Sequence, residues 1–312
     1  MLPCSSRFLA EHDVRSPLRG HSATTVEAAV MARLRSSGFD LPTRDKIPAI
    51  KHLMRAEGPG LALDIGIGTG YTTYSVFGER QTVSVDLDPT NLRNYRERLA
   101  SVPGTRPPLC VVARATALPF KGSAFSFVLC SEVMEHIEDH DAASRELARV
   151  MASDGIAIVT VPYTGLGFTS FLELLRIRTV HDFPGPEYHV RPGYDEASLA
   201  RLMERHGLRL QQQVYYFRFF TRLVTDFVSL GHICYQRLVH RRRAWTWADV
   251  TASERSPVLR VYMSIFPLLW AVSRLDGALS NLRGFGLIAA VRKLSGRCPP
   301  QTIRSEGGHL DP

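Results

Sequence analysis

Short apolar runs alternate along the chain with segments in which apolar residues recur every three or four positions. The apolar runs lie at residues 61–65, 81–85, 109–112, 125–130 and 156–161. Helix-like segments lie between or after them, at residues 71–77, 90–100 and 141–151. Strands that are apolar throughout are buried on both faces, and their alternation with helices is typical of a parallel sheet. The pattern therefore predicts an α/β fold with helices on both faces of the sheet.

The segments on either side of this core predict further elements. Residues 1–23 lack periodicity and are expected to form a tail, and helices are expected near 24–36 and 44–56. After the core, a helix is expected at 195–206, followed by strands at 208–217 and 285–291. These elements divide the chain into N-terminal helices, a core, an insertion, a last core strand and a tail, at residues 1–58, 59–218, 219–283, 284–294 and 295–312.

The insertion at 219–283 is too long for a simple loop between two strands, so we expect helical structure in it. It is aromatic and basic, with HRRR at 240–243 and the apolar run VYMSIFPLLWAV at 261–272. That run is too short to cross a bilayer. A basic, aromatic, amphipathic segment can lie on a membrane surface. It can also form a helical cap packed on the core, which is the interpretation we favour.

A glycine-rich turn follows the first apolar run. The sequence LALDIGIGTGYTT at 61–73 ends a strand at Asp64 and places Gly66, Gly68 and Gly70 at alternate positions before a helix. Glycine lets the backbone turn sharply and approach a ligand without a Cβ in the way. Ligands of open parallel sheets bind at this edge. Asp86 ends the next strand, about 20 residues after the first glycine, which is the spacing of a carboxylate that binds ribose hydroxyls.

This loop, DxGxGxG, resembles the first motif of the class I S-adenosylmethionine-dependent methyltransferases of the small-molecule type. Residues 115–162 continue the resemblance with the landmarks LPF, EH, ELARV and DG in that order. The resemblance implies a Rossmann-like, seven-stranded, mostly parallel sheet whose last strand is antiparallel. It also implies S-adenosylmethionine as the cofactor. The GxGxxG fingerprint of dinucleotide-binding folds is not met, because position 71 is tyrosine.

The resemblance further implies which residues hold the cofactor. The three glycines would pass under its methionine part, and Asp64 would help to hold its amino group. Asp86 would bind the ribose. Leu87 and Ala115 would contact the adenine, and Ser131 would lie near the methionine part.

Two residues depart from the superfamily pattern. Arg114 stands where many relatives have an aspartate that accepts a hydrogen bond from adenine, and arginine has no acceptor. Ser126 replaces a frequent aspartate before the fourth strand. We therefore expect adenine recognition to rest on backbone groups.

Methyl transfer to oxygen needs alignment of the reacting atoms and usually a base, so histidines near the fourth and fifth strands are candidates. His136 closes an ExxEH sequence that begins with Glu132. Some O-methyltransferases of the superfamily carry a similar ExxEH that binds a divalent cation. The alternative is that Glu135 and His136 stabilise the loop after the fourth strand. We favour this alternative and assign no metal ligand.

A second group of candidates follows the fifth strand. His181 and His189 lie in a segment whose proline, glycine and aromatic content suits an active-site lid, and either histidine can act as the base near neutral pH. Arg191 can hold an anionic group of a substrate, and Tyr163 can contact substrate or cofactor. An ordered loop with polar flanking residues is the equally open alternative.

Composition narrows the partners only slightly. The net charge of +8 arises from lysines and arginines scattered among acids, so it does not by itself indicate nucleic acid. A nucleic-acid methyltransferase would usually carry an NPPY-like or cysteine motif where this chain has CSEVMEH. The five cysteines show no CxxC spacing, which excludes a zinc framework of that type. The N-terminus has no apolar secretory segment, so we expect a cytoplasmic location, peripheral to the membrane if the insertion binds lipid.

The sequence thus predicts an enzyme that transfers a methyl group from S-adenosylmethionine to a small-molecule, glycan or lipid-linked acceptor, most readily at oxygen. One alternative is a domain that binds S-adenosylmethionine without catalysis. Another, which we favour less, is an NAD(P)-dependent oxidoreductase, for which the chain lacks both GxGxxG and a catalytic YxxxK.

Overall fold

The computed structural model describes residues 41–54, 60–78, 80–103, 105, 108–167, 170–175, 189–239, 257–279 and 281–294. Its centre is a seven-stranded sheet with the order β3-β2-β1-β4-β5-β7-β6. The strands are β1 (Ala62–Ile65), β2 (Thr82–Asp86), β3 (Leu109–Val112), β4 (Phe125–Ser131), β5 (Met151–Pro162), β6 (Leu208–Tyr216) and β7 (Gly286–Lys293). The first five strands are parallel, and β7 runs antiparallel to both of its neighbours. The predicted fold class is confirmed.

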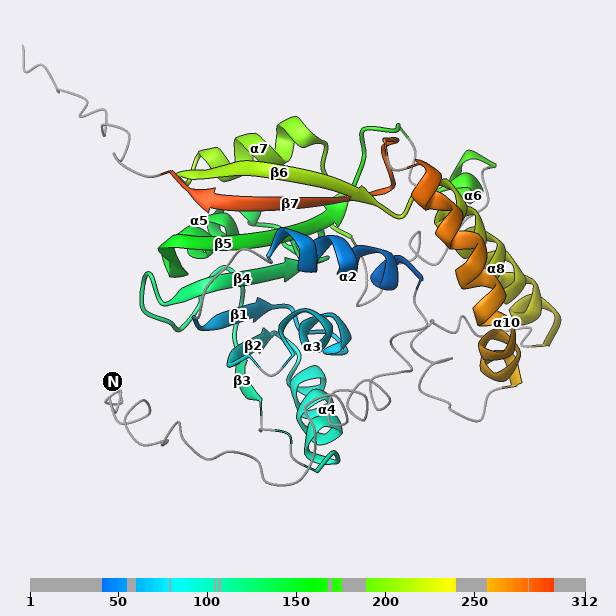
Figure 1. Cartoon of the computed structure of the whole chain (residues 1–312), viewed down its shortest axis with the longest axis horizontal. Helices are drawn as coiled ribbons and strands as arrows, with labels where there is room; N and C mark the ends of the chain where they lie inside the picture. Colours follow the sequence, from blue (N-terminus) through cyan, green and yellow to red (C-terminus); the bar gives the residue numbers. More distant parts are fainter. Residues whose placement is uncertain are drawn as a thin grey trace, which may run out of the picture.

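Helices cover both faces of this sheet (Figure 1). One face carries α2 (Leu41–Leu53), α3 (Tyr71–Phe77) and α4 (Pro89–Ala100), and the other carries α5 (His140–Val150) and α7 (Glu196–Glu204). Of these helices, α3, α4 and α5 each follow a strand of the parallel part and return the chain to the start of the next strand. The helix expected at 24–36 and the tail at 295–312 lie outside the described residues.

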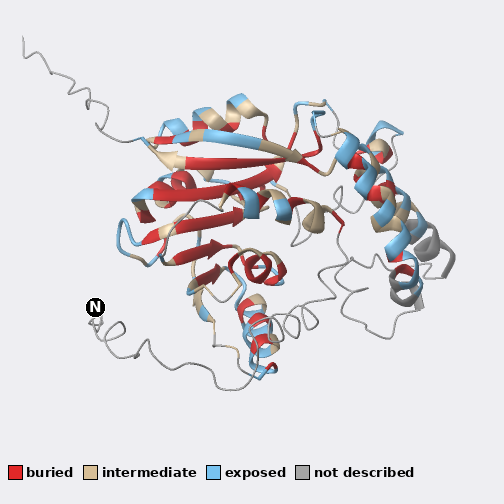
Figure 2. Ribbon diagram, in the orientation of Figure 1, coloured by how far each residue is buried: buried red, intermediate tan, exposed pale blue. Residues whose placement is uncertain are grey.

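The central strands are mostly apolar because each face packs against helices. In β4, Val128 and Cys130 pack in the cluster formed with α5 and α7, whereas Phe127 and Leu129 pack with α2 and α3. All four side chains are at most 2% exposed. Figure 2 shows the same burial along the neighbouring strands.

The start of β5 corrects one predicted boundary. The sequence predicted a helix reaching residue 151 and a strand from 156, but α5 ends at Val150 and β5 begins directly at Met151. Phe125 pairs with Met151, and Phe127 pairs with Ile156, so the intervening residues form a bulge in β5. The DG pair lies in this bulge, where a Cβ on Gly155 would come within 3.0 Å of the Phe125 carbonyl.

The segment between β6 and β7 is helical, with α8 (Phe219–Val239), α10 (Pro257–Ser273) and the 3₁₀ helix η4 (Arg274–Leu279). The two long helices pack side by side at one end of the sheet (Figure 1). The Asp276 carboxylate accepts hydrogen bonds from the amides of Phe220 at 2.8 Å and Thr221 at 2.9 Å. It thereby pairs two of the backbone amides at the start of α8 that have no acceptor within the helix. In the described ranges, no helix combines the length and the apolar character needed to cross a membrane.

Candidate functional site

The glycine loop after β1 has three residues with positive φ, at 78° for Gly66, 51° for Gly68 and 77° for Gly70. A Cβ on Gly66 would overlap the Val133 side chain, and a Cβ on Gly70 would overlap the Tyr95 ring. A Cβ on Gly68 would meet no atom of the described chain within 4 Å. The outer two glycines are therefore required for packing, whereas Gly68 borders open space in which a ligand can approach the backbone.

Asp86 is fixed beside this loop. Its two carboxylate oxygens accept hydrogen bonds from the amide of Gly68 at 3.1 Å and from the amide of Asp88 at 2.9 Å. These bonds tie the end of β2 to the glycine loop. The next residue, Leu87, is 59% exposed. A carboxylate and an apolar side chain are thus presented together at the carboxyl edge of the sheet.

Asp64 lies underneath the loop and is only 2% exposed. Its carboxyl accepts a hydrogen bond from the Thr73 hydroxyl at 2.5 Å. Burial, and then the negative charge of Asp86, raise the pKa of Asp64 to about 7, although the Thr73 bond opposes the shift. A cationic ligand beside this carboxyl would favour its ionised form.

The segment after β3 is held in place by the ELARV helix. The Glu146 carboxylate accepts a hydrogen bond from the Leu118 amide at 2.7 Å. Arg149 donates to the carbonyls of Phe120 at 2.6 Å and Leu118 at 2.8 Å and pairs with Glu146. This explains why a glutamate and an arginine stand three residues apart on α5: they fix the loop that begins at Arg114.

Within that loop, Ala115 is partly buried and Arg114 is exposed. The Ala117 amide donates to the Arg114 carbonyl at 3.0 Å, so the backbone turns back on itself here. The Arg114 side chain therefore lies on the surface of a loop whose backbone is held by Glu146 and Arg149 of α5.

A polar cluster lies where β4 and β5 end. Glu132, which adopts a φ of 56°, accepts hydrogen bonds from Thr160 at 2.7 Å and Tyr216 at 2.6 Å. The ammonium of Lys46 on α2 lies 3.9 Å from the same carboxylate oxygen. Ser131 shares a hydrogen bond with Thr160 at 3.0 Å. Burial acts to raise the pKa of Glu132, but the Lys46 charge and the two hydrogen bonds outweigh it, so the pKa is lowered.

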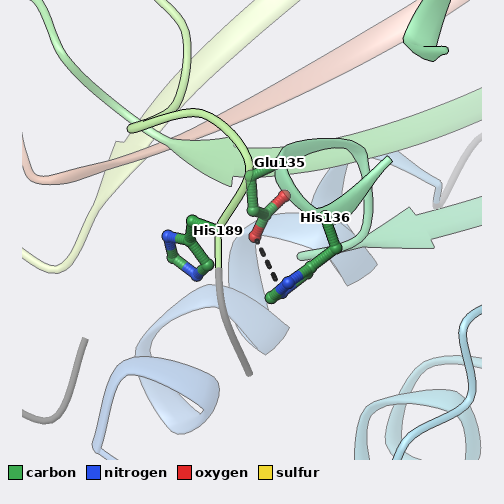
Figure 3. A group of neighbouring side chains, drawn as sticks. All are labelled: Glu135, His136 and His189. Atoms are coloured by element: carbon green, nitrogen blue, oxygen red, sulfur yellow. Dashed lines mark ion pairs between the residues drawn. The ribbon is translucent and has the colours of Figure 1, made fainter. Parts of the chain in front are cut away.

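A second cluster adjoins the first and is formed by Glu135, His136 and His189 (Figure 3). Glu135 and His136 belong to the 3₁₀ helix η2 (Met134–His136), and the Val190 amide donates to the Glu135 carbonyl at 3.0 Å. The His136 and His189 rings pack edge to face with their centres 4.7 Å apart. One ligand atom from each of the three side chains lies within 4.8 Å of the others, so the group has the composition and spacing to hold a metal ion.

The structure brings together most of the predicted site residues at one edge of the sheet, but it gives two of them different contacts. Arg191 was expected to be available for an anionic substrate group. Its guanidinium instead donates to the carbonyls of Ile137 at 2.6 Å and Glu138 at 2.8 Å and contacts His140. It therefore closes the loop after β4.

Tyr163 was expected to contact substrate or cofactor. It is 1% exposed, and its hydroxyl donates to the Glu196 carboxylate at 3.0 Å. Its role is therefore to anchor α7 to the end of β5. His181 lies outside the described residues.

Sequence reasoning missed Lys46, which is 5% exposed on α2. A signal for it was present, because Lys46 lies four and seven residues before Ile50 and Leu53, both of which are buried. A buried lysine on the apolar stripe of an amphipathic helix requires a partner of opposite charge. Glu132 is that partner.

We expect the Glu135→Gln variant to lose less stability at alkaline pH than the wild type. Burial, and then the charge of Glu132, raise the pKa of Glu135 to about 9, from an ordinary value of 4.5. A raised pKa means that folding takes up a proton, so this stabilisation is full below about pH 4.5 and is lost as the pH rises through 9. Asp64 acts in the same direction, so a smaller slope is expected to persist in the variant.

Urea unfolding in the presence of a chelator, at about pH 6 and about pH 9, measures this difference. Glu138→Gln, at an exposed position on the same loop, is the matched control and is expected to follow the wild type. Parallel losses of stability in the wild type and in Glu135→Gln would contradict the assignment of a buried, protonated carboxyl.

Comparison with known proteins bears on this edge of the sheet. Residues 63–159 match the family described as Methyltransferase domain. The chain is 31% identical over 153 residues to the malonyl-[acyl-carrier protein] O-methyltransferase of Halorhodospira halophila, covering 48% of this chain and 45% of that protein. It is 27% identical over 155 residues to the mitochondrial arginine-hydroxylase NDUFAF5 of Danio rerio, with the same coverage. The chain thus spans less than half the length of these curated relatives.

Among solved structures, the [4+2]-cyclase SpnF aligns with a TM-score of 0.50 and 16% identity, covering 80% of this chain and 81% of that one. At this identity the likeness shows the fold alone. The two curated relatives and this structure carry three different activities in their names, so the reaction has to be argued from the residues of the site.

Proposed function

We propose that this chain, whose core belongs to the class I S-adenosylmethionine-dependent methyltransferases, transfers a methyl group from S-adenosylmethionine to an oxygen atom of a small-molecule, glycan or lipid-linked acceptor. The observation that carries the proposal is the pairing of an open glycine loop with a fixed carboxylate. Gly68 leaves room above the backbone, and its amide holds Asp86 at the position expected for a ribose ligand.

The residues of the site fit the cofactor. Gly66, Gly68 and Gly70 would pass under the methionine part, where Asp64 would face the amino group and Ser131 would lie close by. Asp86 would bind ribose, and Leu87 with the fixed loop at Ala115 would enclose adenine. The bound cofactor supplies a methyl group already activated on a sulfonium, so the protein has mainly to align the acceptor and exclude water.

A hydroxyl acceptor needs a group that removes its proton, whereas a carboxylate acceptor is already ionised. His189 and His136 stand at the same edge of the sheet as the glycine loop, and His181 belongs to the segment that precedes His189 in the sequence. Imidazole titrates near neutral pH, which suits a general base. The relative from Halorhodospira halophila, an O-methyltransferase by name, supports oxygen as the accepting atom.

Titration calorimetry with S-adenosylmethionine and S-adenosylhomocysteine, with NADH as the control ligand, tests the cofactor. Micromolar binding of the first two, and none of NADH, is the expected result. If the wild type binds neither, Arg114→Asp separates two causes. Restored binding would locate the fault in the adenine contact, and continued absence would overturn the proposal. Binding without methyl transfer to any hydroxyl or carboxyl acceptor would favour a non-catalytic binding domain.

The acceptor is proposed to be amphipathic and to be reached at an anionic membrane surface, with the enzyme in the cytoplasm. The support is the outer surface of the two long helices. Phe219, Leu223 and Phe227 on α8 follow a helical spacing and are 46%, 44% and 71% exposed. Val261 and Leu268 on α10 are 62% and 67% exposed. In sequence, the residues joining these helices include three consecutive arginines, which favour anionic lipid.

Phe227→Glu and Leu268→Glu together are expected to reduce co-flotation with anionic phosphatidylglycerol vesicles at least about tenfold, since each replaces an inserted apolar group with a charge. Leu109→Glu, at a position 49% exposed on β3, is the matched control and should float like the wild type. Failure of the wild type to float with anionic vesicles would overturn the membrane contact while leaving the cofactor proposal intact.

A further inference from the structure

A buried carboxylate and two imidazoles meet beside the glycine loop. Glu135 and His136 come from η2, and His189 comes from the segment between β5 and α7 (Figure 3). Val133, which precedes η2, lies where a Cβ on Gly66 would be, so the cluster adjoins the proposed cofactor loop. We propose that Glu135, His136 and His189 bind a divalent transition-metal ion. The ion would occupy His136 and His189 in place of the general-base role proposed above and would leave His181 as the remaining candidate base.

The Glu135 carboxylate is the group that most needs a partner. The residue is 0% exposed, and within the described parts of the chain neither carboxylate oxygen has a hydrogen-bond partner. His136 Nε2 lies 4.0 Å from Oε1, an ion-pair contact (dashed in Figure 3) that is too long for a hydrogen bond. Buried polar atoms are nearly always satisfied, and an uncompensated buried carboxylate is costly. A bound cation would satisfy the oxygens directly.

The charges around the cluster also leave a place for a cation. Glu132 already accepts two hydrogen bonds and lies 3.9 Å from Lys46. The Lys46 charge is therefore paired with Glu132, and we do not count Glu132 among the proposed metal ligands. With Glu135 ionised, two carboxylates face one ammonium, and a dication offsets the remaining negative charge.

The donor atoms indicate the kind of ion. Two imidazole nitrogens and one carboxylate oxygen suit Zn²⁺ and neighbouring transition metals, whereas Mg²⁺ and Ca²⁺ prefer sites made of oxygen. Tetrahedral bonds of about 2.1 Å place ligand atoms about 3.4 Å apart. His136 Nε2 lies 4.0 Å from Glu135 Oε1, and the three ligand atoms lie within 4.8 Å of one another, so the side chains would have to close by about 0.6 to 1.4 Å around an ion. Three protein ligands leave a coordination position open, as in catalytic rather than structural zinc sites.

Zinc titration of the full chain, prepared without a histidine tag and stripped with a chelator, tests the site in the absence of cofactor and acceptor. Calorimetry gives the affinity, and elemental mass spectrometry of the dialysed protein gives the stoichiometry. We expect one Zn²⁺ per chain, with much weaker binding of Mg²⁺. Glu135→Gln and His189→Ala are each expected to weaken zinc binding at least about tenfold.

His52→Ala is the matched control, because His52 is an exposed histidine on α2, and it should bind zinc like the wild type. Circular dichroism shows whether each variant is folded, and two separate ligand variants guard against one of them failing to fold. A folded wild type that takes up no zinc would overturn the proposal. So would folded Glu135→Gln and His189→Ala variants that bind zinc as tightly as His52→Ala. Neither result depends on whether the chain transfers methyl groups.

Discussion

Gly68→Arg is expected to abolish S-adenosylmethionine binding, by at least about 100-fold in affinity, while leaving the chain folded. A Cβ on Gly68 meets no atom of the described chain within 4 Å, so the new side chain begins in open space and is expected to extend into the proposed path of the methionine part. The added positive charge also repels the sulfonium. The φ of 51° costs an arginine about 1–2 kcal/mol, so a small loss of stability is expected as well. Calorimetry measures the binding, and thermal unfolding measures the stability.

Gly70→Ala, two residues further on, is expected to fail for a different reason. Its Cβ would overlap the Tyr95 ring at a φ of 77°, so the change acts on packing between the loop and α4. A loss of about 2 kcal/mol or more, equivalent to a fall of about 5 °C in melting temperature, is expected.

Gly68→Asn separates backbone strain at position 68 from blocking of the cofactor by a long side chain. Asparagine tolerates positive φ and is shorter than arginine. It should bind the cofactor more tightly than Gly68→Arg at similar stability. Full cofactor affinity in folded Gly68→Arg would contradict the placement of the methionine part over this loop.

The sheet could be predicted from sequence because burial on both faces leaves a direct trace. The runs at 125–130 and 156–161 are apolar at all positions except Ser126 and Thr160, and β4 and β5 form there. The bulge at the start of β5 leaves no such trace, because the polar residues that it accommodates read as a turn. The length of the insertion indicated helical structure, but not the contact of Asp276 with the start of α8, which joins residues 55 positions apart.

The two halves of the candidate site differ in the same way. The proposed cofactor residues from Asp64 to Leu87 lie in one short motif and at the end of the following strand, so the spacing of the glycines and the resemblance to a family were enough to propose them. The Glu135, His136 and His189 cluster depends on a segment after β5 folding back onto η2, a contact over more than 50 residues whose geometry no local pattern contains. The ExxEH spacing allowed Glu132 as a third cation ligand beside Glu135 and His136, although stabilisation of the loop was the interpretation favoured from the sequence. In the structure the Glu132 carboxylate instead accepts hydrogen bonds from Thr160 and Tyr216 and forms an ion pair with Lys46.

Glu132→Ala is expected to cost about 3 kcal/mol of unfolding free energy. The change removes the acceptor of the Thr160 and Tyr216 hydroxyls, and a buried donor without an acceptor costs about 1–3 kcal/mol. It also leaves the Lys46 ammonium without its ion pair. The side chain of Glu132 is 35% exposed, so water screens that pair and its share is expected to be about 1 kcal/mol. Glu132→Gln should cost less than Glu132→Ala, because the amide oxygen can still accept a hydrogen bond.

A double-mutant cycle separates the charge from the hydrogen bonds. Lys46→Met removes the cation while keeping an apolar stem on α2, and the double variant Lys46→Met with Glu132→Gln carries neither charge. If the ion pair matters as proposed, the double variant is more stable than the sum of the two single losses predicts, by about 1 kcal/mol. Urea unfolding of the four proteins measures this coupling, with Glu138→Ala as the exposed control. Strict additivity would mean that Lys46 and Glu132 are neighbours without an energetic link, and that α2 is held over the site by its apolar contacts alone.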